Sequence, residues 1–310
     1  MKNSLVWQKL EEVKCGGVKL IAVDYDGTVY DRNDKTYNSL DNVIELAFRV
    51  FQSGIDFAFV SGRNTTLDIK LRELGLIFCM KNDCSFTVWR SGGTGAVLNR
   101  LTFTPKKVFV KKIYSNSFDK SLLKKTFDVY KKLKVEPDLK SKIFFNEFLK
   151  NKPPKDLMPE TCYKISCNSK GCVFAEAVKV TFVLPSDINE QKKIINVLRR
   201  KLTPYDLCVS WGNLPFADVG RNLRINGKIV DGKLYMMKNL VKKLKIKDNQ
   251  LATFGDSPND NNKGLLSYPY SFTNDGNIIK SNVYAPPYVL EIKKSPVGAV
   301  YEAINYLIKK

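Results

Sequence analysis

The segment "LIAVDYDGTV", residues 20–29, decides the fold of this chain. Four apolar residues come first, and the acids Asp24 and Asp26 follow, one residue apart. A short apolar run that ends in turn residues is typical of a strand buried on both faces of a parallel sheet. Carboxylates at the end of such a strand repel each other and are costly to desolvate unless a cation neutralises them. The segment therefore predicts a parallel sheet with a charged site at its edge.

Two other segments repeat this pattern. "IDFAFVSGR", residues 55–63, ends in Ser61, Gly62 and Arg63, and "NQLATFGDSPND", residues 249–260, ends in acids. Apolar residues at helical spacing predict helices over 38–54, 64–75, where Gly75 is the expected stop, and 232–246. Strands that alternate with helices at this spacing indicate βαβ units. We therefore expect an α/β fold with a doubly wound, Rossmann-like parallel sheet.

From residue 104 the pattern changes. The segments predict an inserted α+β unit with a half-exposed antiparallel sheet. Its expected strands lie at 106–114, 177–185 and 205–211, and its expected helices at 119–133 and 187–202. Near Arg224 the first pattern returns. We therefore expect a catalytic core formed by residues 1–103 and 223–310, split by an inserted cap at residues 104–222.

Composition limits the chemistry. The 310 residues include no histidine, which excludes Ser-His-Asp and Cys-His nucleophiles and every histidine-ligated metal site. Any hydrolysis must use carboxylates, lysine and a hard cation. The net charge of +20 suits either nucleic acid or small anionic substrates. The lysines come in pairs along helical stretches, without a basic tail, so solvated helix faces explain them and we expect no nucleic-acid partner.

The cysteines and the hydropathy of the chain indicate the cellular compartment in which the protein is expected. Seven scattered cysteines, an odd number, suit a reducing cytoplasm. Cys162, Cys167 and Cys172 are evenly spaced, but more widely than zinc ligands usually are, so ordinary thiols are the simpler interpretation. No apolar stretch is long enough for a membrane span, and the N-terminal residues read as an amphipathic helix rather than a signal peptide. We therefore expect a cytoplasmic protein without a membrane partner.

The residues at the strand ends suggest phosphate chemistry. Because ligands of open α/β sheets bind beyond the carboxyl ends of strands, the acids should meet there, and oxygen ligands favour Mg²⁺. Asp24 can attack phosphorus, and Asp26 can give a proton to the leaving oxygen. Gly27 allows a tight turn whose amides can hold phosphate oxygens. Ser61 can donate to the same phosphate, and Lys233 can balance the charge.

"DYDGT", "SGR", "GKLYMMKNLVKKLKI" and "GDSPND" occur in an order and spacing that resemble the haloacid dehalogenase (HAD) superfamily of phosphatases. The insert resembles the cap of the Cof-like and sugar-phosphate phosphatase branch. The resemblance implies that Asp24 is a nucleophile that forms an aspartyl-phosphate, and that Asp26 is the general acid and then the base. Ser61 and Lys233 would hold the phosphoryl oxygens.

The resemblance also implies a metal site and a substrate site. The Mg²⁺ ligands would be Asp24, Asp26 through its backbone carbonyl, and Asp256, with Asp260 in or next to that shell. Further phosphate or substrate contacts are implied at Gly27, Thr28, Gly62, Arg63 and Asn259.

The chain departs from the family pattern in places. Thr94 stands where relatives usually have asparagine, and Lys228 competes with Lys233 for the lysine position. We prefer Lys233 because its spacing to Met237 and Leu240 keeps the helical register.

These patterns favour an Mg²⁺-dependent phosphomonoesterase that acts on a small phosphorylated metabolite, with a phosphorylated sugar as the first expectation. Three alternatives remain open. A phosphomutase would return the phosphoryl group to its substrate. A receiver-type phosphoacceptor domain would hold that group without catalysis. A nucleic-acid phosphatase is suggested only by the charge.

Overall fold

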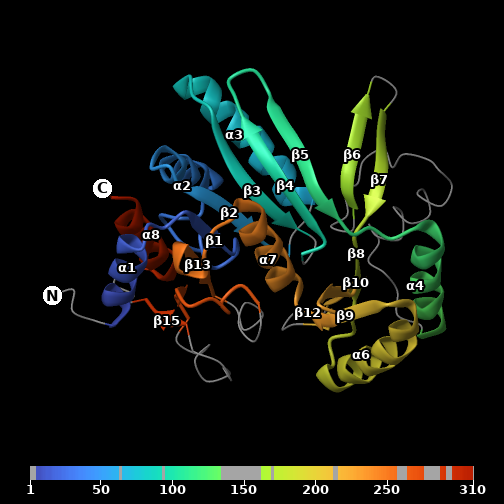
Figure 1. Ribbon diagram of the computed structural model, residues 1–310. Coiled ribbons are helices and arrows are strands. Elements are labelled where there is room, and N and C mark those ends of the chain that lie inside the picture. The colour runs from blue at the N-terminus through green and yellow to red at the C-terminus, as the bar shows by residue number, and fades with distance from the viewer. Residues whose placement is uncertain are drawn as a thin grey trace.

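A computed structural model describes residues 5–62, 65–92, 95–133, 162–168, 171–211, 216–256, 264–275, 287–290 and 295–309. Eight strands form one central sheet (Figure 1). They are β1 (Leu20–Val23), β2 (Asp56–Val60), β3 (Phe86–Gly92), β4 (Val97–Phe103), β5 (Val108–Ser115), β13 (Leu251–Gly255), β14 (Ser271–Thr273) and β15 (Tyr288–Val289). Their spatial order is β15-β14-β13-β1-β2-β3-β4-β5.

The predicted parallel sheet is confirmed for six of these strands, while β4 and β5 extend it in antiparallel fashion. Val23 of β1 is in register with Phe59 of β2 and with Phe254 of β13. Parallel strands in this register end at the same edge of the sheet. The residues that follow them are thereby gathered at that edge, far apart in sequence but close in space.

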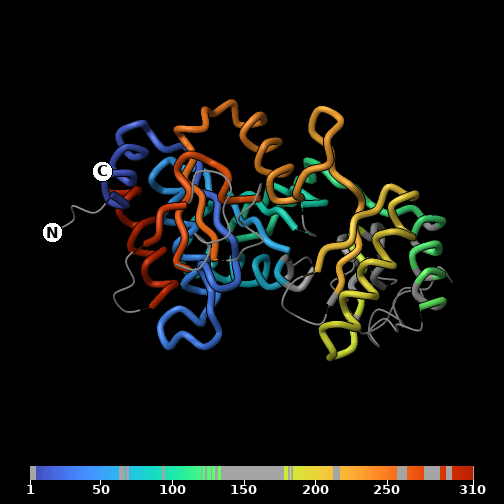
Figure 2. Tube along the Cα trace, turned by 90° about the horizontal axis from the view of Figure 1, so that it is seen from below, coloured from blue at the N-terminus to red at the C-terminus, as the bar shows by residue number. Residues whose placement is uncertain are grey.

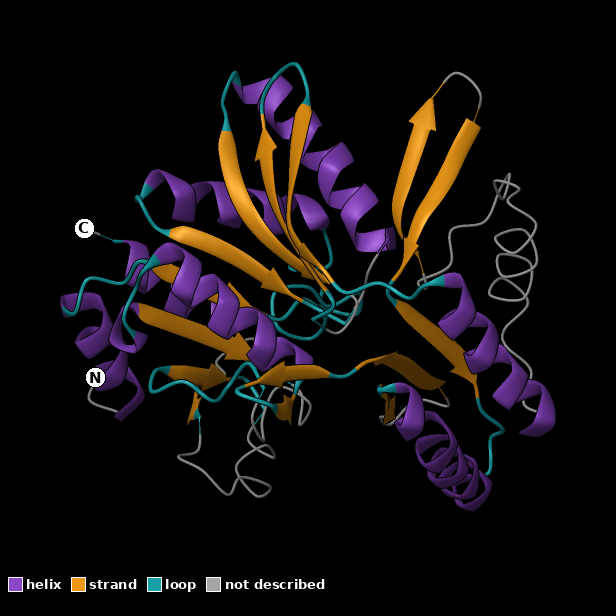
Figure 3. Ribbon diagram, turned by 45° about the vertical axis from the view of Figure 1, so that its right-hand side comes forward, coloured by secondary structure: helices purple, strands orange, loops and turns teal. Residues whose placement is uncertain are grey.

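Helices cover both faces of this sheet, as a doubly wound fold requires (Figure 3). Leu71 and Ile304 pack with Phe57 and Phe59 on one face, and Met236 packs on the other. The first face carries α1 (Leu5–Cys15), α2 (Leu40–Gln52), α3 (Thr65–Asn82) and α8 (Pro296–Ile308), and the second carries α7 (Gly232–Leu244). Within the described part of the chain, no helix could cross a membrane.

Helix α3 is longer than the sequence indicated. The expected stop at Gly75 is wrong, because the helix continues to Asn82. A Cβ at position 75 would lie 2.3 Å from the ring of Phe103. Glycine is therefore needed here so that α3 can pack closely on β4, and not to end the helix.

The inserted unit forms a second lobe beside the core (Figure 2). Its antiparallel sheet has the order β8-β10-β9, and Val180, Phe182 and Val219 pack against Leu198 of the helical layer. The elements are α4 (Lys120–Leu133), β8 (Lys179–Val183), α6 (Ile188–Leu202), β9 (Leu207–Trp211) and β10 (Phe216–Arg221). A hairpin, β6 (Cys162–Asn168) with β7 (Gly171–Ala177), and a second hairpin, β11 (Leu223–Ile225) with β12 (Lys228–Val230), form separate two-stranded sheets. Short 3-10 helices lie at Thr203–Tyr205 and Asp248–Gln250.

Strand β5 was expected to belong to the inserted unit that begins at residue 104. Strand β5 pairs with β4 along its length and so belongs to the central sheet. The last backbone hydrogen bond of this segment to the core is that from the N–H of Asn116 to the carbonyl of Ala96, at 2.8 Å. The sequence misplaced this strand because an exposed, lysine-rich edge strand has the same half-polar pattern as a strand of the cap. The division into a catalytic core and a specificity cap is otherwise a proposal.

Candidate active site

The edge of the sheet carries a buried ion pair. Asp24 directly follows β1 and is 7% exposed. Lys233, in the first turn of α7, places its Nζ 3.1 Å from Asp24 Oδ1, and each side chain is only 10% exposed. Lys228, the competing candidate, lies exposed on β12. The lysine that meets the first acid is therefore Lys233, and burial makes its charge more effective than it would be in water.

Local interactions at the start of α7 bring Lys233 to this position. Asp231 is the N-cap residue, and its Oδ1 accepts hydrogen bonds from the backbone N–H groups of Lys233 and Leu234, at 2.8 and 3.3 Å. Gly95 of the turn before β4 packs against the helix start with φ of +85°, and a Cβ there would lie 2.1 Å from the carbonyl oxygen of Gly232. A side chain at position 95 would therefore push α7 and its lysine away.

The turn after Asp24 holds the second acid, Asp256. Gly27 has φ of +73°, and a Cβ at this position would lie 2.0 Å from Asp256 Oδ2. Thr28, which is fully buried, donates a hydrogen bond from Oγ1 to Asp256 Oδ1 at 3.0 Å. Glycine is thus required at position 27 for backbone conformation and for the close approach of a carboxylate.

The two acids influence each other. Burial, followed by the negative charge of Asp24, raises the pKa of Asp256 from 3.8 to about 6. The hydrogen bond from Thr28 and the charge of Lys233 lower the pKa of Asp256, but by less than the other two effects raise it. Ionisation of Asp256 is therefore costly at this position, because the side chain is buried beside the negative charge of Asp24.

The loop after β2 connects the site to the cap. Ser61 is 2% exposed, and its backbone N–H donates to the carbonyl of Ser91 on β3 at 3.3 Å. The next carbonyl, that of Gly62, accepts a hydrogen bond from Lys179 Nζ of β8 at 3.4 Å. The same nitrogen lies 3.1 Å from Asp218 Oδ2 of β10. A buried cap lysine thus contacts the backbone beside Ser61.

The remaining predicted residues have different outcomes. Asp26 is partly buried, and its backbone forms a bridge with Tyr30 that closes the turn. Arg63, Asn259 and Asp260 lie outside the described residues, as does Thr94. Among the residues that are described, no group of three or more acidic, cysteine or histidine side chains is placed to hold a metal ion. The predicted third carboxylate ligand, Asp260, is outside that set.

Sequence reasoning missed three residues of this region: Lys179, Asp231 and Asn274. Asn274 follows β14, and its Nδ2 donates to the carbonyl of Gly27 at 2.8 Å. The sequence gives little signal for Asn274, because "SFTND" contains a single apolar residue and does not look like a buried strand. Lys179 gives no signal either, since a lysine in an alternating strand is normally solvated.

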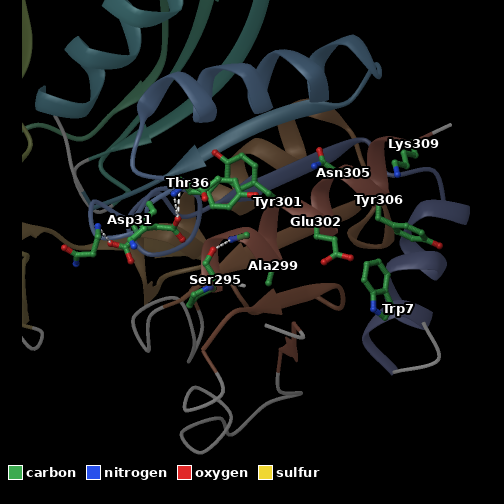
Figure 4. Close-up of a pocket in the computed structure, with 16 residues that line it drawn as sticks. Trp7, Asp31, Thr36, Ser295, Ala299, Tyr301, Glu302, Asn305, Tyr306 and Lys309 are labelled. Carbon is green, nitrogen blue, oxygen red and sulfur yellow. Dashed lines mark hydrogen bonds between the residues drawn. The ribbon is translucent and has the colours of Figure 1, made fainter. Parts of the chain in front are cut away.

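A cavity of about 860 Å³ lies elsewhere, between the loop of residues 31–37 and α8 (Figure 4). Trp7, Tyr301 and Glu302 are among its lining residues. None of Asp24, Asp26, Lys233 or Asp256 lines it. This cavity is therefore separate from the acids at the sheet edge.

A parallel sheet with two carboxylates and a lysine at its carboxyl edge defines an α/β enzyme whose ligand site lies beyond the strand ends. Residues 21–263 match the family described as haloacid dehalogenase-like hydrolase. The chain therefore belongs to the haloacid dehalogenase-like hydrolases, which confirms the family and the enzyme class predicted from the motifs. A comparison with curated proteins finds no match.

Solved structures share this fold. A HAD/COF-like hydrolase from Plasmodium vivax is 18% identical, with a TM-score of 0.62, and the match covers 96% of this chain and 98% of that one. A haloacid dehalogenase-like hydrolase from B. subtilis is 15% identical, with a TM-score of 0.56 and coverages of 93% and 99%. A sugar phosphatase of HAD subclass IIB is 16% identical, with a TM-score of 0.52 and coverages of 93% and 98%. At these identities the likeness shows the fold.

Proposed function

We propose that this protein is an Mg²⁺-dependent phosphomonoesterase that acts on a small phosphorylated metabolite, a sugar phosphate in the first instance, through an aspartyl-phosphate on Asp24. The observation that carries the proposal is the buried pair of Asp24 and Lys233, 3.1 Å apart, beside a second carboxylate on the Gly27 turn. A lysine in this position can stabilise both the attacking carboxylate and the charge of a transferred phosphoryl group.

The donor set fits a hard divalent cation. Asp24 and Asp256 offer carboxylate oxygens, Asp26 offers its backbone carbonyl, and histidine does not occur in the chain. Burial and the charge of Asp24 raise the pKa of Asp256, so a divalent cation between the two carboxylates would relieve their repulsion. When bound, Mg²⁺ would neutralise these carboxylates and the phosphoryl oxygens of the substrate.

The residues of the chain supply the chemical steps. A carboxylate oxygen of Asp24 attacks phosphorus, the bond from phosphorus to the leaving oxygen breaks, and Asp26 gives its proton to that oxygen. Asp26, now ionised, takes a proton from a water molecule that attacks the phosphoryl group, which releases phosphate and restores Asp24. Ser61 and Lys233 donate hydrogen bonds to the phosphoryl oxygens in both steps.

The cap supports a small polar substrate. Lys179 and Asp218 form a donor and acceptor pair on one face of the cap sheet, and Lys179 also contacts Gly62, next to Ser61. A cap that lies this close to the phosphate site limits the leaving group to a small molecule. A neighbour of the same fold is described as a sugar phosphatase. These features favour a phosphorylated sugar over a nucleic acid.

We also propose that the protein is cytoplasmic. Four of its cysteines, Cys15, Cys79, Cys84 and Cys208, are free thiols in the structure. Free thiols are the usual state in a reducing compartment.

The test is phosphate release from p-nitrophenyl phosphate and from a panel of sugar phosphates, with Mg²⁺ or with EDTA. We expect turnover only with Mg²⁺, and a loss of about a thousandfold or more in Asp24→Asn. The matched control is Asp31→Asn, a partly buried acid of the following loop, which keeps an acceptor for the backbone N–H of Asn33 and should keep full activity. Asp24→Asn with undiminished turnover would rule out the mechanism. Accumulation of a sugar bisphosphate in place of free phosphate would show a phosphomutase instead.

A further inference from the structure

Asn274 connects a fourth strand end to the catalytic turn. It is 3% exposed and directly follows β14. Its Nδ2 donates a hydrogen bond of 2.8 Å to the carbonyl oxygen of Gly27, which is 247 positions away in the sequence. This carbonyl lies one residue after Asp26, so the contact reaches the part of the turn that carries Asp26.

The sheet register explains how the contact forms. Thr273 of β14 is in register with Gly255 of β13, so Asn274 and Asp256 lie next to each other at the edge. Asp256 holds the turn through Thr28 and Asn274 holds it through Gly27. Two neighbouring strands thus fix the same turn from adjacent positions.

The amide of Asn274 has a second polar atom. The carbonyl of Gly27 requires a donor, which fixes the orientation of the amide with Nδ2 toward that carbonyl. Oδ1 is then buried and accepts no hydrogen bond from any described residue. A buried acceptor without a donor costs about 1–3 kcal/mol, and this one belongs to the residue next to Asp256 at the edge of the sheet, where a bound ligand could supply the donor.

We propose that Asn274 is a positioning residue with two tasks in the phosphatase reaction proposed above, on which this inference rests. Its Nδ2 fixes the Gly27 carbonyl and thereby the direction of Asp26. Its Oδ1 would serve as an acceptor for the hydrated divalent cation that Asp24 and Asp256 would hold. Water on a divalent cation is a strong donor, and such outer contacts orient the ligands of a metal site.

Two substitutions separate these tasks. Asn274→Leu removes both the donor and the acceptor while it keeps the approximate shape of the side chain. Asn274→Asp removes the donor toward Gly27 but keeps an acceptor and adds a negative charge. The matched control is Asn99→Leu, because Asn99 of β4 is also fully buried in the central sheet and its amide has no partner among the described residues.

Three quantities are measured for each protein: kcat and KM with p-nitrophenyl phosphate, the Mg²⁺ dissociation constant by titration calorimetry without substrate, and the melting temperature. We expect Asn274→Leu to lower kcat and weaken Mg²⁺ binding, each by about tenfold or more, with KM changed less than about threefold. Asn274→Asp should lower kcat by a similar factor, but its affinity for Mg²⁺ should be equal to or higher than that of the wild type. Asn99→Leu should keep both kcat and the Mg²⁺ dissociation constant.

A change of melting temperature alone, with kcat and Mg²⁺ binding of Asn274→Leu equal to those of the wild type, would overturn the inference. Equal effects of Asn274→Leu and Asn274→Asp on Mg²⁺ binding would overturn the task assigned to Oδ1. If the wild type hydrolyses none of the substrates, the proposed function fails, whereas the calorimetric titration still decides whether Asn274 serves a cation site.

Discussion

The replacement Asp256→Asn provides a sharp test of the electrostatics of the site. The substitution removes one of the two carboxylates that lie beside Lys233, and it keeps an acceptor for the hydrogen bond from Thr28. We expect the variant to be more stable than the wild type without metal, and to have lost its function. Such a trade of stability for function is common at charged active sites.

The magnitude follows from the pKa. Burial and the charge of Asp24 raise the pKa of Asp256 from 3.8 to about 6. Each pKa unit corresponds to about 1.4 kcal/mol, so the ionised carboxylate costs the folded state up to about 3 kcal/mol. Because the pKa is raised on folding, the folded protein binds the proton more tightly. Stability is therefore lost as the pH rises from about 4 to about 6, and the whole cost is present above that range.

The assay is thermal and urea unfolding in EDTA at several pH values from 4 to 8, repeated with Mg²⁺ at neutral pH. In EDTA above pH 6, Asp256→Asn should exceed the wild type by up to about 3 kcal/mol, and near pH 4 the two should converge. With Mg²⁺ the order should reverse, because only the wild type gains binding free energy.

The matched control is Asp206→Asn in the cap. Burial acts against ionisation of Asp206, but hydrogen bonds from Asn222 and Arg224 prevail and lower its pKa. This variant should therefore lose stability above pH 4, with the opposite sign. If Asp256→Asn were less stable than the wild type in EDTA at neutral pH, the carboxylates would not be in conflict, and the reasoning that leads to a cation site would fail.

Other substitutions test individual contacts. Lys233→Met removes the cation 3.1 Å from Asp24 and should lower kcat/KM with p-nitrophenyl phosphate by about a hundredfold or more. Gly95→Ala places a methyl group 2.1 Å from the carbonyl oxygen of Gly232, so the melting temperature should fall and kcat should fall with it as α7 shifts. An unchanged kcat in this variant would mean that α7 tolerates the displacement. Lys179→Met breaks the contact between the cap and the phosphate site, and it should reduce kcat/KM for sugar phosphates by more than for p-nitrophenyl phosphate, whereas equal reductions would argue against a role in substrate choice.

The fold was largely predictable from the sequence because its signals are local. The apolar run that ends at Asp24 and the helical spacing around Leu46 and Met237 are each readable within a few residues. The errors concern features in which a distant residue decides. Gly75 looked like a helix stop, but the ring of Phe103 is what requires glycine there. Strand β5 looked like part of the cap because its edge position makes it half-polar.

The candidate site was predictable in part for the same reason. Three predicted strands end in acids or in serine, and the carboxyl ends of parallel strands lie at one edge of the sheet. The sequence therefore predicts that Asp24, Asp26 and Asp256 meet at that edge. The sequence could not choose between Lys228 and Lys233 except by helical register. In the structure Lys233 contacts Asp24, because the N-cap residue Asp231 and the packing of Gly95 place the start of α7 beside Asp24.

By itself, then, the sequence determined the alternation of strands and helices and the oxygen ligands that the acids at the strand ends offer to a metal ion. It also excluded histidine-dependent chemistry, because the chain has no histidine. Only the tertiary structure decided that Asn274 reaches Gly27, that Lys179 of the inserted unit reaches Gly62, and that Asp256 packs on the turn at Gly27. The physical reason is range. Secondary structure follows from interactions within a few residues, whereas burial, the pKa of a carboxylate and the partner of a buried amide depend on groups brought together by folding.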